Sequence, residues 1–190
     1  MSFSVILPTL NEKGHIIELI EEISNIFILK KKEFEIIVVD DNSTDGTQDV
    51  VEQHLSVKKY LKLIKRKSNI KNLADALQEG VNESTNNYII WMDADFQHPP
   101  KYIKNFIEIS DRYDVVISSR FLKKSERYFN SDKLKKEINE NQSYLFNKLC
   151  KLLLFKDLTD YTSGFICVRK EILQGYSLKG YYGDYFVKLL

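Results

Sequence analysis

The sequence predicts an α/β fold with a mostly parallel sheet and helices on both faces. Between residues 1 and 120, short runs rich in β-branched residues alternate with segments of helical spacing. Such alternation is typical of parallel strands joined by right-handed crossover helices. In addition, 43% of the 190 residues are apolar, which is enough for one domain with a core. We therefore expect a single domain over residues 1–190.

Each predicted element has its own signal. Five runs predict strands, at Ser4–Leu7, Glu35–Val39, Leu61–Ile64, Tyr88–Met92 and Val115–Ser118. Four segments between them have helical spacing, over Ile16–Phe27, Val50–Leu55, Leu73–Val81 and Tyr102–Ile107. Ser43-Thr44-Asp45 is a capping cluster before the second helix, and Pro99-Pro100 opens the fourth. Beyond Arg120 the pattern predicts a basic stretch (Lys123–Lys136), a long helix (Leu134–Phe155), a strand (Phe165–Val168) and a helix (Lys170–Gln174).

The charge balance indicates no charged macromolecular partner. Lys and Arg number 28 against 27 Asp and Glu, so the net charge is +1 and nothing points to nucleic acid. No apolar segment is long enough for a membrane-spanning helix. The basic stretch Lys123–Lys136 is by default a solvated face, but it would also suit an anionic membrane or a lipid phosphate.

Three of the predicted strands end in acidic residues. The first is followed by PTLNE, the second by DDNSTDGT, and the fourth by Asp93-Ala94-Asp95. Any one of these is more often a polar loop or a helix cap. Ligands of open parallel sheets, however, bind beyond the carboxyl ends of the strands, and three acidic ends on one edge favour a cation with a phosphorylated ligand.

The spacing of Asp93 and Asp95 predicts a metal site. Strand residues i and i+2 point the same way, so the two carboxylates converge, and Gln97 continues the row if the chain stays extended. Mg²⁺ prefers one or two carboxylates together with phosphates and water. Such an ion stabilises the charge that develops on a departing nucleoside diphosphate.

Five motifs in this order resemble a known family. PTLNE, VVDDNSTDGT, MDADFQHPP, SSRF and DYTSGF are similar to family 2 glycosyltransferases with the GT-A (Rossmann-like) fold, and most of all to those that act on polyprenyl phosphates such as dolichyl phosphate. The resemblance implies metal-dependent, inverting transfer of a mannose- or glucose-type hexose from a nucleotide-diphosphate sugar to a polyprenyl phosphate. It implies Mg²⁺ or Mn²⁺ as cofactor and a cytoplasmic location at a membrane face.

The resemblance also assigns residues. Asp93, Asp95 and Arg120 are the expected catalytic residues, and Asp93, Asp95 and Gln97 the expected metal ligands. Asp160, Thr162 and Ser163 match a loop near the acceptor. The nucleotide sugar is expected to bind at Pro8, Glu12, Val38, Asp40, Asp93, Ala94, Asp95 and Arg120.

Two alternatives and three departures bear on this assignment. A saccharide hydroxyl acceptor would need a general base, for which Asp157 and Asp160 are candidates, whereas a phosphate acceptor needs none. A catalytically impaired nucleotide-binding remnant is the second alternative. Leu10 occupies a position where the family usually has tyrosine or a similar aromatic residue. Asn72 and Ala74 occupy positions where the family usually has glycines. Members of the family continue past the position of Leu190, so we expect residues 1–190 to lack the family's C-terminal extension.

Overall fold

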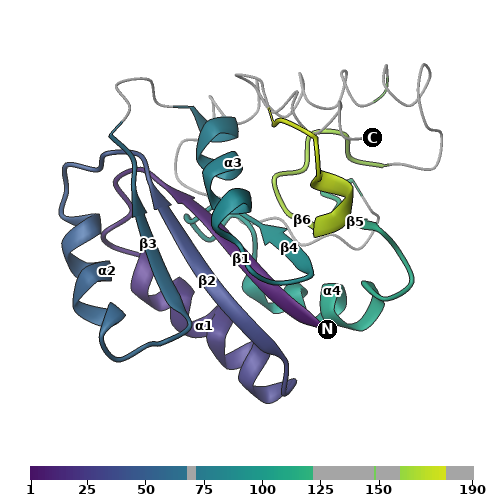
Figure 1. Cartoon of the computed structure of the whole chain (residues 1–190), viewed down its shortest axis with the longest axis horizontal. Coiled ribbons are helices and arrows are strands. Elements are labelled where there is room, and N and C mark those ends of the chain that lie inside the picture. Colours follow the sequence, from purple (N-terminus) through teal and green to yellow (C-terminus); the bar gives the residue numbers. More distant parts are fainter. Residues whose placement is uncertain (68–71, 122–147, 149–158, 179–190) are drawn as a thin grey trace.

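The computed structural model describes residues 1–67, 72–121, 148 and 159–178. Its strands form one sheet in the order β3-β2-β1-β4-β6-β5 (Figure 1). The four strands β1–β4 pair in parallel, β6 runs antiparallel to β4, and β5 runs antiparallel to β6. The strands are β1 (Ser2–Thr9), β2 (Glu33–Asp40), β3 (Leu61–Lys65), β4 (Tyr88–Trp91), β5 (Val115–Ile117) and β6 (Ile166–Arg169).

Helices cover both faces of this sheet. They are α1 (Ile16–Leu29), α2 (Thr47–Leu55), α3 (Leu73–Glu83) and α4 (Ile103–Ile109), with short 3-10 turns η1 (Pro100–Tyr102) and η2 (Lys170–Leu173). The predicted fold class is therefore confirmed, and each predicted element that falls on described residues is present within a few residues of its expected ends. The predicted helix Leu134–Phe155 and the basic stretch Lys123–Lys136 lie outside the described residues.

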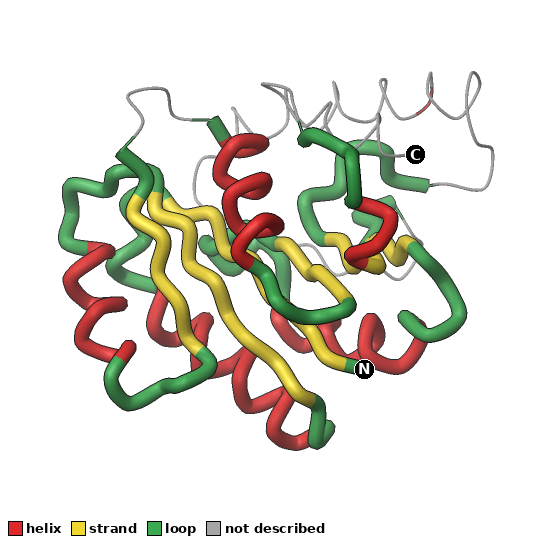
Figure 2. Tube along the Cα trace, in the orientation of Figure 1, coloured by secondary structure: helices red, strands yellow, loops and turns green. Residues whose placement is uncertain are grey.

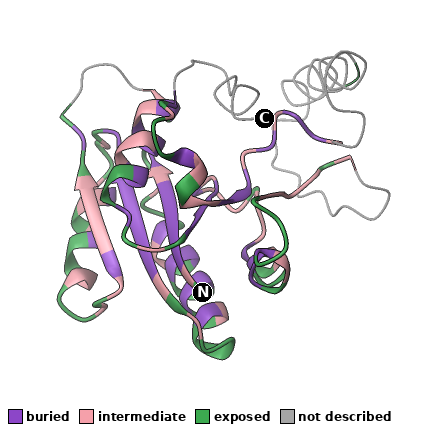
Figure 3. Cartoon of the chain, turned by 45° about the vertical axis from the view of Figure 1, so that its right-hand side comes forward, coloured by how far each residue is buried: buried purple, intermediate pink, exposed green. Residues whose placement is uncertain are grey.

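Two apolar cores explain why the central strands read as continuous hydrophobic runs. Side chains of a strand alternate between faces, so Val5 and Leu7 of β1 pack with α1, α2 and α4, whereas Ile6 packs with α3 and η2. The strands between the two layers are buried on both sides, as Figure 3 shows. Trp91 is 1% exposed and belongs to the second core, so it is a packing residue.

The topology fixes where a ligand can bind. From β1 the chain proceeds to β2 and β3 on one side, and β4 returns to the other side of β1. This reversal places a topological switch point at the carboxyl ends of the paired strands β1 and β4, and open α/β sheets bind ligands at such points. The loops after β1, β2 and β3 gather at the same end of the sheet (Figure 2). None of the described helices has the length and apolarity needed to cross a bilayer.

Candidate active site

The loops that follow β1 and β2 interlock. The backbone N–H of Asn11 donates to Ser43 Oγ at 2.8 Å, and the N–H of Thr44 donates back to Asn11 Oδ1 at 2.9 Å. The N–H of Glu12 donates to Thr47 Oγ1 at 2.9 Å. The motifs PTLNE and DDNSTDGT are therefore one unit, whose hydrogen bonds hold Glu12 at the switch point.

Asp40 belongs to the framework of this unit. Its side chain is fully buried, and Oδ1 accepts from the Ser43 N–H and from Gln48 Nε2, at 2.9 and 2.5 Å. Oδ2 accepts from Ser43 Oγ at 2.6 Å and from Thr9 Oγ1 at 3.3 Å. Both carboxylate oxygens thus accept hydrogen bonds from the protein itself. Val38 likewise packs in the core. The assignment of both residues to donor binding stays a prediction.

A cleft of about 310 Å³ opens at the switch point. Five of the residues that were expected to bind the donor line it, namely Pro8, Glu12, Asp93, Ala94 and Asp95. The other lining residues are Thr9, Leu10, Asp41, Asn72, Leu73 and Ala76. Asp41 lines the cleft, whereas the sequence analysis assigned its neighbour Asp40 to the donor. Thr9 and Leu10 follow Pro8 at the end of β1, whereas Asn72, Leu73 and Ala76 come from the start of α3, which packs against the sheet.

One wall of the cleft is held by a buried arginine. Arg66, whose side chain is 3% exposed, donates through Nη1 to Asp41 Oδ1 at 2.7 Å and through Nε to Glu79 Oε1 at 2.9 Å. The N–H of Asn72 donates to Asp41 Oδ2 at 3.1 Å, and the Asn72 side chain caps α3 by accepting from the Ala74 N–H. Asn72 has φ −146°, so asparagine in place of the family's glycine causes no backbone strain here.

The cleft concentrates negative charge. Burial raises the pKa of Glu12, and repulsion from Asp95 adds to this shift. The pKa of Asp93 is also raised, first by loss of hydration, and Asp95 contributes again. Asp93 still keeps 45% of its side-chain surface exposed. Glu12 and Asp93 are both repelled by Asp95, and a bound cation would relieve this repulsion.

The expected geometry of the aspartates needs correction. Strand β4 ends at Trp91, so Asp93 and Asp95 follow the strand instead of extending it. The chain then turns at Phe96, which has φ +61° in the left-handed region. Gln97 consequently folds back, and its Nε2 donates to Asp95 Oδ2 at 2.5 Å. Gln97 thus lies beside Asp95 through a turn, not through continued extension.

The donor set nonetheless fits a hard divalent cation. Two carboxylates and an amide supply only oxygen ligands, once the Gln97 amide rotates by half a turn to present its carbonyl. Among the described residues no three Asp, Glu, His or Cys side chains converge as a ready-made metal centre. This arrangement suits an ion whose remaining ligands come from substrate phosphates and water.

His98 contacts both the backbone and the side chain of Asp93. The N–H of Asp93 donates to His98 Nδ1 at 3.1 Å, and the ring stacks on Phe165 with centroids 5.4 Å apart. Burial lowers the pKa of His98, so the ring is neutral near pH 7 and Nδ1 can accept. Gly164 lies against the same pair, since a Cβ there would be 2.9 Å from His98 Cε1 and 3.3 Å from Asp93 Oδ2. Nothing in the residues around His98 indicates this contact with Asp93 and Phe165.

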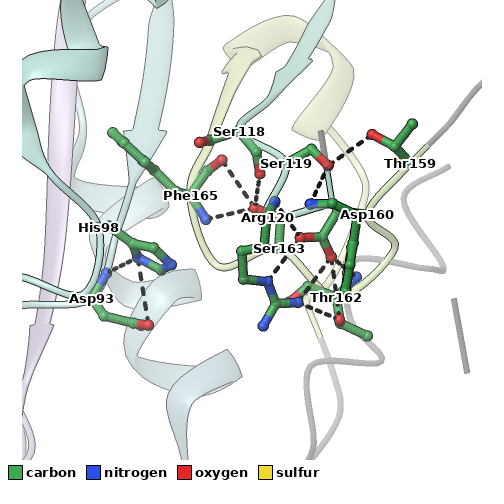
Figure 4. Close-up of polar contacts among 11 residues, drawn as sticks. Asp93, His98, Ser118, Ser119, Arg120, Thr159, Asp160, Thr162, Ser163 and Phe165 are labelled. Carbon is green, nitrogen blue, oxygen red and sulfur yellow. Dashed lines mark hydrogen bonds and ion pairs between the residues drawn. The ribbon is translucent and has the colours of Figure 1, made fainter. Parts of the chain in front are cut away.

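Arg120 lies across from Asp93 and is held by Asp160 (Figure 4). Its Nε donates to Asp160 Oδ2 at 2.8 Å and its Nη2 to Asp160 Oδ1 at 2.9 Å, which is a planar two-point fork. Nη2 also donates to Thr162 Oγ1 at 2.6 Å. The Asp160 side chain has no exposed surface, so it is badly placed to act as the general base of the saccharide alternative. Asp157 lies outside the described residues.

Comparison with known proteins identifies the family. The model of "Glycosyl transferase family 2" matches residues 4–176. The chain belongs to glycosyl transferase family 2. It is 36% identical over 179 residues to a dolichol-phosphate mannosyltransferase of Pyrococcus furiosus, covering 94% of this chain and 49% of the relative. It is 31% identical to a dolichol-phosphate mannosyltransferase of Saccharomyces cerevisiae over 64% of this chain and 45% of the relative.

Solved structures of glycosyltransferases share the fold. Glucosyl-3-phosphoglycerate synthase of Mycobacterium tuberculosis superposes with a TM-score of 0.70 at 18% identity, over 97% of this chain and 62% of that one. TarS of S. aureus superposes with a TM-score of 0.65 at 20% identity, over 100% of this chain and 55% of that one. The predicted GT-A fold is confirmed. This family 2 chain spans about half the length of the curated relatives it matches, and its predicted single domain without a C-terminal extension stays a prediction.

Proposed function

We propose that this family 2 glycosyltransferase moves a mannose- or glucose-type hexose from a nucleotide-diphosphate sugar to a polyprenyl phosphate, with inversion. The observation that carries the proposal is the acidic cleft at the switch point, in a chain that is 36% identical to a dolichol-phosphate mannosyltransferase over 94% of its length. Solved fold neighbours were crystallised with Mn²⁺ and UDP-glucose or with UDP-GlcNAc, which supports a nucleotide-sugar donor.

The position of each site residue suggests the part of the donor that it would contact. Pro8 and Glu12 would hold the nucleoside end of the donor, with Asp41 as a further polar contact at the same wall. Asp93, Asp95 and Gln97 would hold Mg²⁺ or Mn²⁺, which supplies charge neutralisation for the departing diphosphate. Arg120 would meet the phosphate oxygens with its planar guanidinium. Glu12, Asp93 and Asp95 repel one another, so the donor and its ion bind where the protein's charge is otherwise uncompensated.

The class of acceptor can be inferred from whether the attacking oxygen must first lose a proton. A phosphate oxygen is ionised at neutral pH and attacks without a base, whereas a sugar hydroxyl must lose its proton. Asp160, one of two candidate bases, is buried and engaged by Arg120. This favours the phosphate acceptor over the saccharide. A polyprenyl phosphate would bring the chain to the cytoplasmic face of a membrane. Contact through Lys123–Lys136 stays a prediction, since that stretch lies outside the described residues.

The test is a transfer assay with defined partners. GDP-mannose and UDP-glucose are each incubated with a short polyprenyl phosphate in detergent, with Mg²⁺, Mn²⁺ or EDTA, and lipid-linked hexose is measured. We expect product only with metal and only with the phosphorylated lipid. The variant Asp95→Asn should lose transfer, and the exposed Asp111→Asn should serve as a matched control. Transfer to an added oligosaccharide but not to the lipid would favour a saccharide acceptor, and no donor binding would favour the remnant.

A further inference from the structure

Asp160 is a buried charge that the proposed reaction leaves without a role. Its carboxylate has no exposed surface, although it lies in the loop that leads into β6 at the edge of the site. Oδ2 accepts from both Nε and the backbone N–H of Arg120, at 2.8 and 3.1 Å. Oδ1 accepts from Arg120 Nη2 at 2.9 Å and from the Thr162 N–H at 3.1 Å. Arg120 therefore gives three of these four hydrogen bonds.

The two-point contact with Asp160 fixes the orientation of the Arg120 guanidinium. Because the guanidinium is planar, two parallel contacts through Nε and Nη2 fix the plane of the group and the direction in which its outer edge points. The Arg120 side chain keeps 45% of its surface exposed, so it is held by Asp160 and Thr162 while still open to solvent. A long side chain would otherwise sample many rotamers before meeting a phosphate.

The loop that carries Asp160 is tied to the segment that carries Arg120. Ser163 Oγ donates to the carbonyl of Ser118 at 2.6 Å, and Thr159 Oγ1 donates to Ser119 Oγ at 2.8 Å. These bonds flank Asp160 on both sides, as Figure 4 shows. Gly164 of the same loop lies against Asp93 and His98. One loop thus fixes Arg120 relative to Asp93, the residue expected to hold the metal.

We infer that Asp160 is a positioning residue, which orients the guanidinium of Arg120 toward the diphosphate of the donor and takes no proton in the reaction. The consequence for binding rests on the proposed function, whereas the orientation of Arg120 does not. The competing interpretation is that the ion pair merely stabilises the loop, and Glu35 offers a matched comparison. Glu35 is another buried carboxylate with several hydrogen bonds, at the opposite end of the strands.

The first experiment needs no ligand. Phenylglyoxal modifies accessible arginines, and peptide mass spectrometry gives the rate at Arg120 in the wild type, in Asp160→Asn and in Glu35→Gln. We expect Asp160→Asn to raise the rate at Arg120 several-fold and Glu35→Gln to leave it unchanged. Should Asp160→Asn fail to fold, Thr162→Val removes one acceptor of Nη2 without touching a buried charge, and a smaller increase is expected. An unchanged rate in the folded variant would overturn the inference.

The second experiment measures the consequence. Calorimetry with Mn²⁺ compares a nucleoside diphosphate, GDP or UDP, with its nucleoside. We expect Asp160→Asn to weaken the diphosphate by about tenfold or more, because a small displacement of a positioned group has large effects, and to leave the nucleoside unchanged. In an Arg120→Gln background the Asp160 change should add nothing. An equal loss for diphosphate and nucleoside would show a structural role. A wild type that binds neither would count against the proposed function, while the phenylglyoxal rates still judge the orientation.

Discussion

Replacing Gly80 with alanine has two opposite effects on stability, a gain in helix propensity and a steric clash. Gly80 lies in the middle of α3, where alanine is favoured over glycine by about 1 kcal/mol of helix propensity. A Cβ at this position, however, would be 2.5 Å from Cγ2 of Ile6 and 3.2 Å from its Cγ1 and Cδ1. Carbon atoms pack at about 3.5–4.0 Å, so the helix or the strand must move by about 1 Å.

The clash with Ile6 should cost more stability than the gain in helix propensity provides. Ile6 is fully buried in β1, and its Cγ2 is attached at the branch point, so no flexible end can swing away. Overpacking of this kind costs about 1–3 kcal/mol, and three close contacts place Gly80→Ala near the upper end. After the propensity gain we expect a net loss of about 1–2 kcal/mol, or a Tm lower by about 2–8 °C for a chain of this size. The cleft should suffer too, because Leu73 and Ala76 of α3 line it.

The assay is urea denaturation followed by circular dichroism, with Gly14→Ala as the control, since nothing lies within 4 Å of a Cβ there. A second background makes the test sharper. Ile6→Ala removes all three contacting atoms, so Gly80→Ala should become stabilising in that background. A Gly80→Ala protein as stable as the wild type, or the same sign in both backgrounds, would refute the reasoning.

Three further outcomes are expected. The pKa of Glu35 reflects a loss of hydration that is outweighed by hydrogen bonds from Lys62, Ser4 and Thr85, and the net shift is below its ordinary value of 4.5. The stabilisation by Glu35 is therefore complete above about pH 4.5 and is lost as pH falls through the lower pKa of the folded state. Glu35→Gln should make the free energy of unfolding less dependent on pH in this acidic range. The same dependence on pH in both proteins would contradict this. Gly164→Ala should lower the affinity for Mn²⁺ with a nucleoside diphosphate by about tenfold, because its methyl group meets His98 and Asp93, and unchanged calorimetry would exclude the close approach. Burial raises the pKa of the Cys167 thiol to about 12, so iodoacetamide at pH 8 should alkylate it only in urea, as mass spectrometry of the folded protein can check.

The fold was predictable because its signals are local. β-branched runs and helical spacing alternate regularly, and every predicted strand was found. The direction of β6 was not predictable in this way. It is separated from β5 by a long segment with no strand pattern, so the rule that alternation implies parallel strands does not apply, and β6 lies antiparallel between β4 and β5.

The sequence predicted residues of the cleft but not their geometry. Asp93 and Asp95, chosen for their spacing, line the cleft, but the spacing rule applies to an extended chain. The turn at Phe96 adopts a left-handed conformation that glycine or asparagine usually marks, and phenylalanine gives no such signal. Leu73, Ala76 and Gly164 reach the site through packing between distant segments. Nothing in their own sequence neighbourhood distinguishes them from ordinary helix or loop residues.

Acids near one sheet edge do not share one role, and their partners separate them better than their positions do. Asp40 and Asp160 are fully buried, and each carboxylate accepts four or more hydrogen bonds, so each holds a loop or a side chain in place. Glu12 and Asp93 line the cleft, and their pKa values are raised, so their charge is a cost to the free protein. A bound cation lowers that cost only for the second pair. Sequence spacing locates all four acids, but only the hydrogen bonds distinguish the two that are engaged by the fold from the two that line the cleft.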